Sequence, residues 1–484
     1  MIALPATILQ NMAPSDPERL QLPRSLITFP PEILSTIISY VEPCGLANLS
    51  RTCQQLYRET ADDRIWLRKI QQFLPDFNPL PDASKLNFRA LYGAFHPYWF
   101  LPQHRLWFCD SHPEGALVLI RFDYRTEYIE AYRFLTSRRD ITIEPWDDDF
   151  DVHMASFDPR PHLQAYNPEF HLLSQMQRHL DPKMRETKNR ITGDRELPVR
   201  GRDVTMHAAL TLARALPSEA QGRNTATWPT QDFPARDRVR NESPTGFQGG
   251  HRPQSLDEAS DQVFRRRTWY GGKLGGLAAN TVETYSTIDP LVYTPTPAKP
   301  WRGIWVGDYS AHGCEFILVH QPDKGASATA IPNPSILSKS RGQWPNPWDG
   351  SMVAIKLTGD GNVPRGQTTW RTDKIGPSGT IRVATAQPFQ DAHLVRGEGH
   401  VASYGFKNGK FFYIEVDVDQ KIPGSNRYCA DSFVPVQIIL QKPDQATGIA
   451  DRIAIYWEEF GFIAHFHRVD VNDMKLYNNI VMDD

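Results

Sequence analysis

Three short clusters in the sequence combine residue types that could do chemistry. His465 and His467 alternate along a predicted strand, which places two imidazoles on one face, as a metal site would need. No third ligand stands nearby, and the aromatic neighbours are typical of an ordinary sheet. The acidic run 147–151 lacks the spacing and the terminal glutamate of a calcium loop. The glycine-rich run 271–276 does not join a clear strand to a helix, so it does not predict a phosphate loop. We therefore expect no metal and no cofactor.

Three polar residues remain as candidates for binding. His312 and Glu315 would present a polar pair at the mouth of a barrel, and Asp360 would accept a hydrogen bond from a peptide N–H group. The alternative is structural, because the surrounding stretches are rich in glycine and proline, which supply turns, and Asp360 can cap a turn. The sequence contains no G-x-S-x-G, P-loop or H-E-x-x-H motif. Binding is therefore a better expectation than catalysis.

Charge and composition exclude several classes of partner. The 484 residues include 53 Lys and Arg against 56 Asp and Glu, a net charge of −3, so no global field attracts nucleic acid or an anionic membrane. No run of about 20 apolar residues could cross a bilayer. The N-terminus lacks a basic region before an apolar core, and the five cysteines are scattered without a C-x-x-C pair. These features predict an intracellular protein, cytoplasmic, nuclear or both.

The elements that must position these residues begin with helices. We predict that residues 1–24 are disordered and that 25–74 form three short helices. Pro30 and Pro31 stand where a first helical turn tolerates proline, and apolar residues then recur every three or four positions. So small a bundle buries too little apolar area alone, which suggests a surface completed by a partner or by the rest of the chain.

The rest of the chain predicts antiparallel strands. Short aromatic and β-branched runs, separated by turn residues, occur in 88–150 and again in 300–475, where Asn408-Gly409 is typical of a hairpin turn. Residues 151–299 predict a largely irregular insertion with two helical patterns, FHLLSQMQRHL and HAALTLARAL. In it, Arg265–Arg267 would either grip an acidic partner or end a solvated linker. The predicted fold class is α+β: a helical block, then a β-barrel or sandwich with a long insertion.

The helical block resembles an F-box. The run Phe29-Pro30-Pro31-Glu32-Ile33-Leu34, a second helix with a Leu and a Cys, and the late Ile65-Trp66 pair follow that family's pattern. The resemblance implies docking on the Skp adaptor and, through it, on the cullin-RING ligase core. The residues that we expect to bind the adaptor are Leu26, Pro30, Ile33, Leu34, Ile37, Leu46, Leu49 and Trp66. The alternative is that these residues pack only against their own protein.

Motifs in the predicted β domain resemble a second region of that family. The stretches 302–316 and 356–366, with 395–402 and 459–462, look like the C-terminal domain of the F-box only protein thirty-one family. That resemblance implies a β-barrel that holds the C-terminal segment of a target protein. The implied function is a non-catalytic substrate receptor of an SCF-type (Skp-cullin-F-box) ubiquitin ligase, with an unknown target.

Two other functions stay open. The β domain could be an enzyme or a small-ligand carrier fused to the helical block, which predicts a cavity with converging polar groups. Alternatively, the F-box could act with the adaptor alone, without ubiquitination.

Overall fold

The chain divides into two compact units, residues 1–96 and residues 97–484. The computed structural model describes residues 26–78, 87–111, 113–138, 141–188, 195–201, 206–218, 227–240, 253–270, 281–309, 312–323, 325–332, 346–402, 431–474 and 476–477. The predicted disordered segment 1–24, the Asn408-Gly409 turn and the glycine-rich run 271–276 lie outside these ranges.

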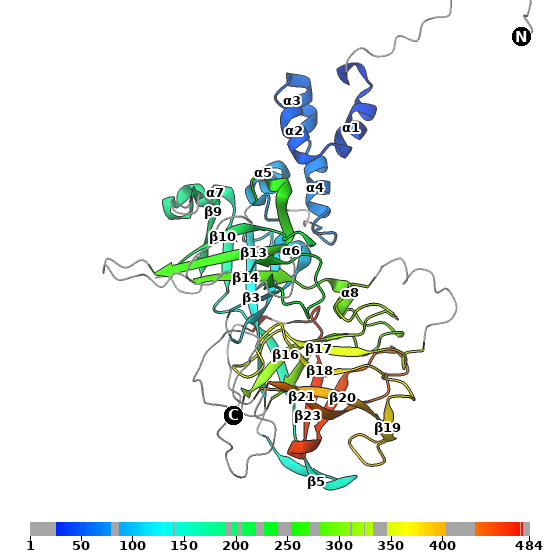
Figure 1. Cartoon of the computed structure of the whole chain (residues 1–484). Coiled ribbons are helices and arrows are strands. Elements are labelled where there is room, and N and C mark those ends of the chain that lie inside the picture. Colours follow the sequence, from blue (N-terminus) through cyan, green and yellow to red (C-terminus); the bar gives the residue numbers. More distant parts are fainter. Residues whose placement is uncertain are drawn as a thin grey trace, which may run out of the picture. The chain divides into compact units, whose positions relative to one another are not determined.

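The first unit is helical. Its elements are η1 (Leu26–Thr28), α1 (Pro31–Tyr40), α2 (Pro43–Leu49), α3 (Gln54–Thr60), α4 (Asp63–Gln71) and α5 (Phe88–Phe95) (Figure 1). Proline opens both α1 and α2, and the side chain of Asp62 caps α4 by accepting from the backbone N–H of Arg64. The expectation of three helices in 25–74 was wrong by one, because a turn at 50–53 separates α2 from α3.

The core of this unit is built from one face of each helix. Leu34, Leu46 and Ile70 are fully buried, and the indole N–H of Trp66 donates to the carbonyl of Thr60 at 2.7 Å. Tyr92 of α5 packs on Trp66 with 5.3 Å between ring centroids. Helix α5 therefore belongs to the helical unit, although the sequence had predicted residues from 88 onward as the start of the β domain.

The second unit contains two sheets, and in each of them a ring of antiparallel strands closes into a barrel. The first sheet has 11 strands, and three of them (β6, β8 and β24) lie off a ring of eight that β2–β3 pairing closes. The ring consists of β2 (Ala116–Asp123), β1 (Leu106–Cys109), β14 (Thr281–Thr287), β13 (Ala259–Tyr270), β10 (Met206–Arg214), β9 (Arg195–Gly201), β7 (Phe170–Leu173) and β3 (Tyr128–Arg138). The strands off this ring are β6 (Pro159–Gln164), β8 (Thr187–Lys188) and β24 (Leu476–Tyr477).

The second sheet repeats this plan. Again three of 11 strands lie off a ring of eight, which β15–β23 pairing closes. The ring consists of β15 (Gly303–Asp308), β16 (Cys314–His320), β17 (Met352–Lys356), β18 (Thr368–Thr372), β20 (His393–Val401), β21 (Ser432–Leu440), β22 (Arg452–Trp457) and β23 (Phe462–Arg468). The strands off it are β4 (Ile143–Trp146), β5 (Asp149–Ala155) and β19 (Thr380–Val383). Closure pairs the backbone groups that an open sheet would leave unpaired at its edges.

Short elements connect and cover the barrels. They are α6 (Phe100–His104), α7 (Gln175–Leu180), η3 (Pro182–Met184), β11 (Thr227–Trp228), β12 (Val239–Arg240), η5 (Leu256–Glu258), α8 (Pro290–Tyr293) and η7 (Glu458–Phe460). A continuous apolar core joins the barrels, in which Phe134 of β3 contacts Phe316 of β16 with 5.7 Å between ring centroids.

The expectation of an irregular insertion at 151–299 was wrong. This segment supplies five of the eight strands of the first ring, β7, β9, β10, β13 and β14, as well as most of β5. The pattern HAALTLARAL forms strand β10 rather than a helix, because its backbone pairs with β9 and β13. The pattern FHLLSQMQRHL divides into strand β7 and the short helix α7. The β domain therefore has two barrels where one was expected.

Candidate functional site

The surface of helix α1 is the clearest candidate for a binding site in the helical unit. Ile33, Ile37 and Tyr40 follow each other at helical spacing, and their exposed fractions are 48%, 36% and 81%. Residues four and seven positions apart share one face of a helix, so these side chains form an apolar stripe. Tyr57 of α3 is also exposed, at 53%. Apolar side chains left in water along one face are typical of a protein-binding surface.

The eight residues that the sequence predicted for adaptor binding differ in their exposure to solvent. Pro30, Ile33 and Ile37 are exposed, and Leu26 and Leu49 are half-buried. Leu34, Leu46 and Trp66 are buried in the core of the helical unit. The buried three shape the surface without lying on it. Tyr40 and Tyr57 were missed; Tyr40 stands at helical spacing from Ile33, which was the available signal.

Two of the three polar residues predicted in the β domain, Glu315 and Asp360, converge on one lysine. The ammonium group of Lys356 lies 2.7 Å from a carboxylate oxygen of Glu315 and 2.8 Å from one of Asp360. It also lies 4.3 Å from the centre of the Tyr309 ring. Only 2% of the lysine side chain is exposed. A buried ammonium needs such partners, because leaving water without them is costly.

The two carboxylates of this cluster differ in protonation. Burial, opposed by Lys356 and reinforced by the charge of Asp360, raises the pKa of Glu315 to about 8. Burial also acts on Asp360, but Lys356 and hydrogen bonds outweigh it and lower the pKa of Asp360 to about 2. The side chain of Asp360 accepts from the backbone N–H groups of Asn362 and Val363, as a turn cap does. Lys356 therefore pairs with one ionised carboxylate near neutral pH.

His312 joins the cluster at its exposed rim, where its Nε2 lies 3.3 Å from the side-chain nitrogen of Asn362. The structure thus brings Glu315 and Asp360 together, and His312 reaches them through Asn362. Glu315 and Asp360 serve the packing of the barrel through Lys356, and His312 is the member that solvent reaches. A role for these residues in holding a target stays a prediction.

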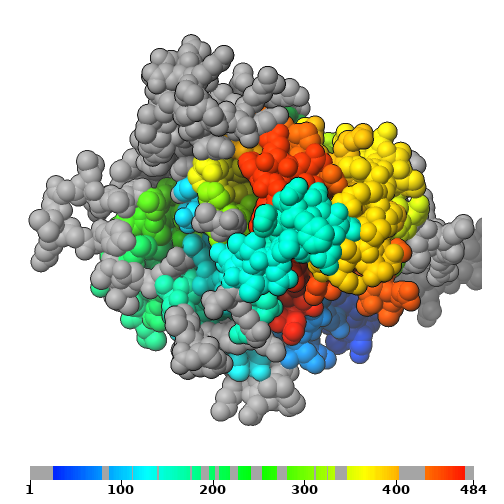
Figure 2. Space-filling view, turned by 90° about the horizontal axis from the view of Figure 1, so that it is seen from below, coloured from blue at the N-terminus to red at the C-terminus, as the bar shows by residue number. Residues whose placement is uncertain are grey.

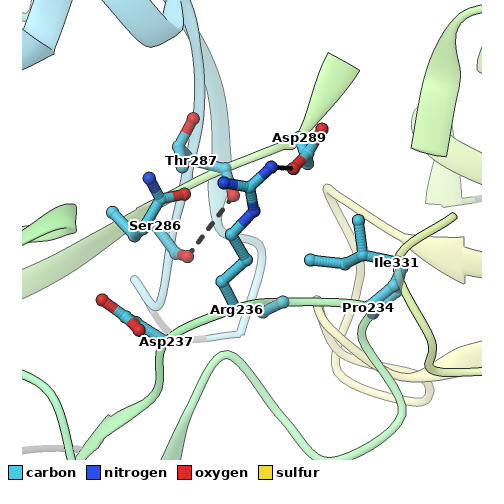
Figure 3. Close-up of a pocket in the computed structure, with 9 residues that line it drawn as sticks. Pro234, Arg236, Asp237, Ser286, Thr287, Asp289 and Ile331 are labelled. Carbon is cyan, nitrogen blue, oxygen red and sulfur yellow. Dashed lines mark hydrogen bonds and ion pairs between the residues drawn. The ribbon is translucent and has the colours of Figure 1, made fainter. Parts of the chain in front are cut away.

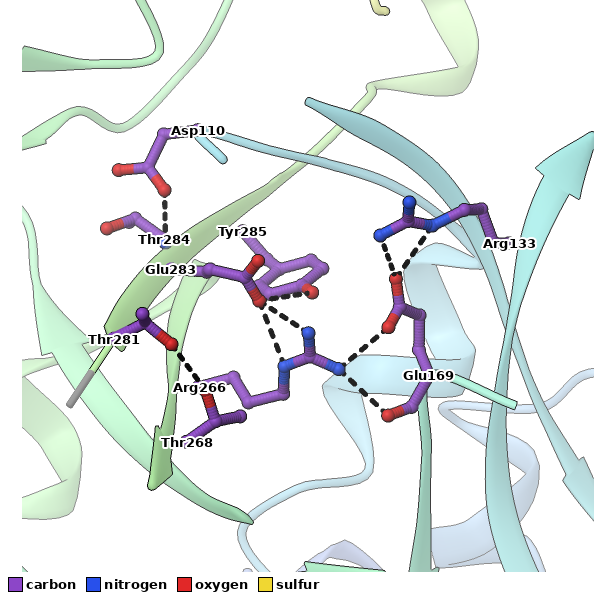
Figure 4. A network of polar contacts seen from close by, with 9 residues as sticks. All are labelled: Asp110, Arg133, Glu169, Arg266, Thr268, Thr281, Glu283, Thr284 and Tyr285. Carbon is purple, nitrogen blue, oxygen red and sulfur yellow. Dashed lines mark hydrogen bonds and ion pairs between the residues drawn. The ribbon is translucent and has the colours of Figure 1, made fainter. Parts of the chain in front are cut away.

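A second buried network lies in the first barrel (Figure 4). Arg266 of β13 donates to the carboxylate of Glu169 at 2.8 Å and pairs with Glu283 of β14 at 2.5 Å. Arg133 of β3 approaches the other oxygen of Glu169 at 2.6 Å, and the hydroxyl of Tyr285 donates to Glu283. Two arginines thus balance two carboxylates. Sequence reasoning missed this network because its members are far apart in the chain.

Aromatic rings continue this packing in the first barrel. Phe264 stacks on Tyr285 with 4.8 Å between ring centroids, and Trp107 and Phe170 contact Phe264 edge-on. Phe264 and Tyr285 are fully buried. Ion pairs and packed rings fill this part of the barrel, which is the arrangement of a core.

A shallow crevice lies where the 234–237 segment meets β14 (Figure 3). Arg236 spans it to pair with Asp289 at 2.6 Å, and the side chains of Ser286 and Thr287 line one wall. Ile331, from the loop after β16, closes the opposite side. The crevice is polar, and its arginine is already paired with a carboxylate.

Candidate metal ligands do not gather in the part of the chain that the structure describes. No group of three His, Cys, Asp or Glu side chains there is placed to hold a metal ion. His465 and His467 instead contact Phe389 and Phe157, and burial lowers the pKa of both imidazoles. None of the described helices is long and apolar enough to span a membrane.

Two protein families match parts of the chain. Residues 27–72 match the F-box-like family, which covers α1 to α4. Residues 285–473 match the family described as the cyclin D1 binding domain, which contains the whole second barrel ring. The chain is thus an α+β protein in which N-terminal helices that match the F-box-like family precede antiparallel β-barrels.

Individual relatives cover less of the chain. It is 26% identical over 144 residues to the chloroplastic protein EXECUTER 2 of Arabidopsis thaliana, a match of 27% of this chain and 19% of that protein. The Oryza sativa subsp. japonica EXECUTER 2 is 26% identical over 141 residues, 28% of this chain and 19% of that protein. The matches thus span about a fifth of these relatives. A structure of intact Ap-TbpB (N and C lobes) has 9% sequence identity to this chain and a TM-score of 0.10. The alignment covers 74% of this chain and 66% of that chain.

Proposed function

We propose that the protein is a substrate-recognition subunit of a Skp-cullin-F-box ubiquitin ligase. In this role the helical unit binds the Skp adaptor, the adaptor binds the cullin-RING core, and the β-barrel unit binds a target protein. The chain itself needs no catalytic residue, because holding a target near the ubiquitin-loaded enzyme raises the local concentration of its lysines. The complex would act in the cytoplasm, the nucleus or both.

The observation that carries this proposal is the apolar stripe on α1 within the F-box-like region. Ile33, Ile37 and Tyr40 remain exposed although a buried aliphatic or aromatic side chain stabilises a fold by about 2 kcal/mol. A partner helix laid along the stripe would bury them. The buried Leu34 and Leu46 keep α1 and α2 in place, so they affect the surface through packing.

The role of the β unit is supported by the family match over 285–473. The motifs at 302–316 and 356–366, which resemble the target-binding domain of the F-box only protein thirty-one family, lie in the second barrel and its loops. We therefore place target binding on the second barrel. The family's name gives a cyclin as one class of protein to test as the target.

The test is co-capture of the Skp adaptor and cullin by the full-length protein from cell extract. The test variant is Ile33→Glu with Ile37→Glu, which puts two charges on the stripe. Its matched control is Asn48→Glu with Gln72→Glu, which adds the same charges at exposed polar positions of α2 and at the end of α4. We expect the wild type and the control to capture both proteins and the stripe variant to capture neither.

Two results would contradict the proposal in different ways. Capture of the adaptor without cullin would indicate a role with the adaptor alone. Capture of neither by the wild type would leave the helical unit without a ligase function.

A further inference from the structure

The β4–β5 hairpin and the η7 turn together expose two phenylalanines among carboxylates. Phe150 in β5 has 71% of its surface exposed, and Phe460 in η7 has 57%. Asp149 and Asp151 flank the first ring in sequence, and Glu458 and Glu459 precede the second. We call the set Phe150, Phe460, Asp149, Asp151, Glu458 and Glu459 the acidic aromatic edge.

Strand pairing brings the two halves of this edge together. Strands β5 and β23 run parallel, with His153 opposite Phe462 and Met154 opposite Ile463. In a parallel pair of strands, the residues that precede the paired segments lie at the same end of both strands. The backbone N–H of His153 donates to the carbonyl of Gly461 at 2.8 Å, which fixes η7 beside the Asp149–Asp151 segment.

Two buried residues of the hairpin anchor it to the second barrel. Trp146 and Val152 are buried in a small core with Ile439, Ala454 and Ile463. These buried contacts hold the hairpin against the second barrel. The exposed Phe150 therefore lies on a strand and not in a loop. In Figure 2 the teal surface of the hairpin borders the orange-red surface of the C-terminal strands, open to solvent on this face of the molecule.

The charge of the edge is unopposed among the described residues. No described lysine or arginine forms an ion pair with Asp149, Asp151, Glu458 or Glu459; the carboxylate of Glu458 accepts only from the amide of Gln437, at 2.9 Å.

Arg382, the cation in contact with the hairpin, is already paired with the neighbouring Asp148 at 3.3 Å and stacks on Trp146. Burial and the carboxylates of Asp149 and Glu458 raise the pKa of Tyr456.

We propose that the acidic aromatic edge binds a lysine- or arginine-rich segment of a partner protein. Exposed aromatic faces attract cations, and the surrounding carboxylates complete the ion pairs. The same charge repels phosphate, so nucleic acid and anionic membranes are the wrong chemistry for this surface. The proposal goes beyond adaptor binding and does not depend on it.

The test is fluorescence anisotropy of the full-length protein with a labelled 12-residue peptide of alternating Arg, Gly, Lys and Ser. The first variant is Phe150→Ala with Phe460→Ala. The second is Asp151→Asn with Glu459→Gln, and its matched control is Glu114→Gln with Asp257→Asn, which removes two exposed carboxylates elsewhere. We expect each edge variant to bind about tenfold more weakly than the wild type and the control to bind normally.

Three results would overturn the proposal. One is no binding by the wild type at low salt, and another is equal loss in the control, which would indicate general attraction to an acidic surface. The third is concentration-dependent self-association that Phe150→Ala with Phe460→Ala abolishes, because the edge would then bind a second copy of the chain. All variants change exposed residues, so circular dichroism melting should match the wild type. Adaptor capture by these variants should also be unchanged, which separates failure here from failure of the ligase role.

Discussion

At the scale of single residues, neighbouring positions on α1 have opposite roles. Leu34 is fully buried, whereas almost half of Ile33 is exposed. The sequence assigned both to the adaptor, because helical spacing alone does not say which side of a stripe the core takes. Contacts from the other helices, which are distant in sequence, decide it.

We expect Leu34→Ala to lower the free energy of unfolding of the helical unit by about 2–5 kcal/mol, as cavity-forming changes do. Ile33→Ala should cost less than about 1 kcal/mol, because this side chain is largely in water already. Urea denaturation followed by circular dichroism measures both. Equal losses would mean that Ile33 is also part of the core.

Glu315 predicts a dependence of stability on pH. Burial and Asp360 raise its pKa from the ordinary value of 4.5 to about 8, so the folded chain holds a proton there that the unfolded chain releases. The folded state therefore binds more protons between these values, and the contribution of this group to stability falls as pH rises from about 5 to about 8.

Glu315→Gln should remove that fall, because the amide keeps the shape of the protonated acid and does not titrate. The measurement is the difference in unfolding free energy between the variant and the wild type at several pH values from 5 to 8. A difference that stays constant across this range would contradict the assignment.

At the scale of elements, the sequence predicted those strands that consist of a short run of apolar residues. The runs LWFC and CEFILVH correspond to β1 and β16 residue for residue. The pattern HAALTLARAL predicts a helix, because alanine and leucine favour helices, yet it forms strand β10. Hydrogen bonds to β9 and β13 override that local preference, and no local pattern reveals them.

Strand β13 escaped prediction for an electrostatic reason. The run Arg265–Arg267 predicts either a solvated linker or a grip for an acidic partner. Arg266 and Arg267 instead pair with Glu169, just before β7, and with Glu283 and Glu196 in β14 and β9. The partner of Arg266 on β14 is 17 residues away, and Glu169 is 97 residues away. A basic run predicts a solvent-exposed segment, and only ion pairs with carboxylates distant in sequence allow it to be buried.

We therefore expect Arg266→Met to destabilise the barrel unit by about 3–5 kcal/mol, because it leaves Glu169 and Glu283 buried with too few partners. The comparison variant is Arg125→Met, whose ion pair with Asp123 is on the surface and is worth about 1 kcal/mol or less. Thermal unfolding by calorimetry compares the two. Similar melting temperatures would mean that the network contributes nothing to the fold.

At the scale of the whole molecule, the sequence established the order of the parts but not the number of barrels. The F-box-like region and the return of strands after residue 300 were both predicted, and the family matches over 27–72 and 285–473 fall in those parts. The first barrel was not predicted, because five strands of its ring come from residues 151–299, which predicted an irregular segment. Each of these strands is defined by hydrogen bonds to strands that are distant in the sequence.

The central claim is that α1 of the full-length protein binds the Skp adaptor. Hydrogen exchange of the full chain, with and without purified adaptor, tests it most directly. We predict slower exchange in 31–40 and 54–60 when the adaptor is added, and loss of that protection in Ile33→Glu with Ile37→Glu. Unchanged exchange in both helices at saturating adaptor would contradict the claim.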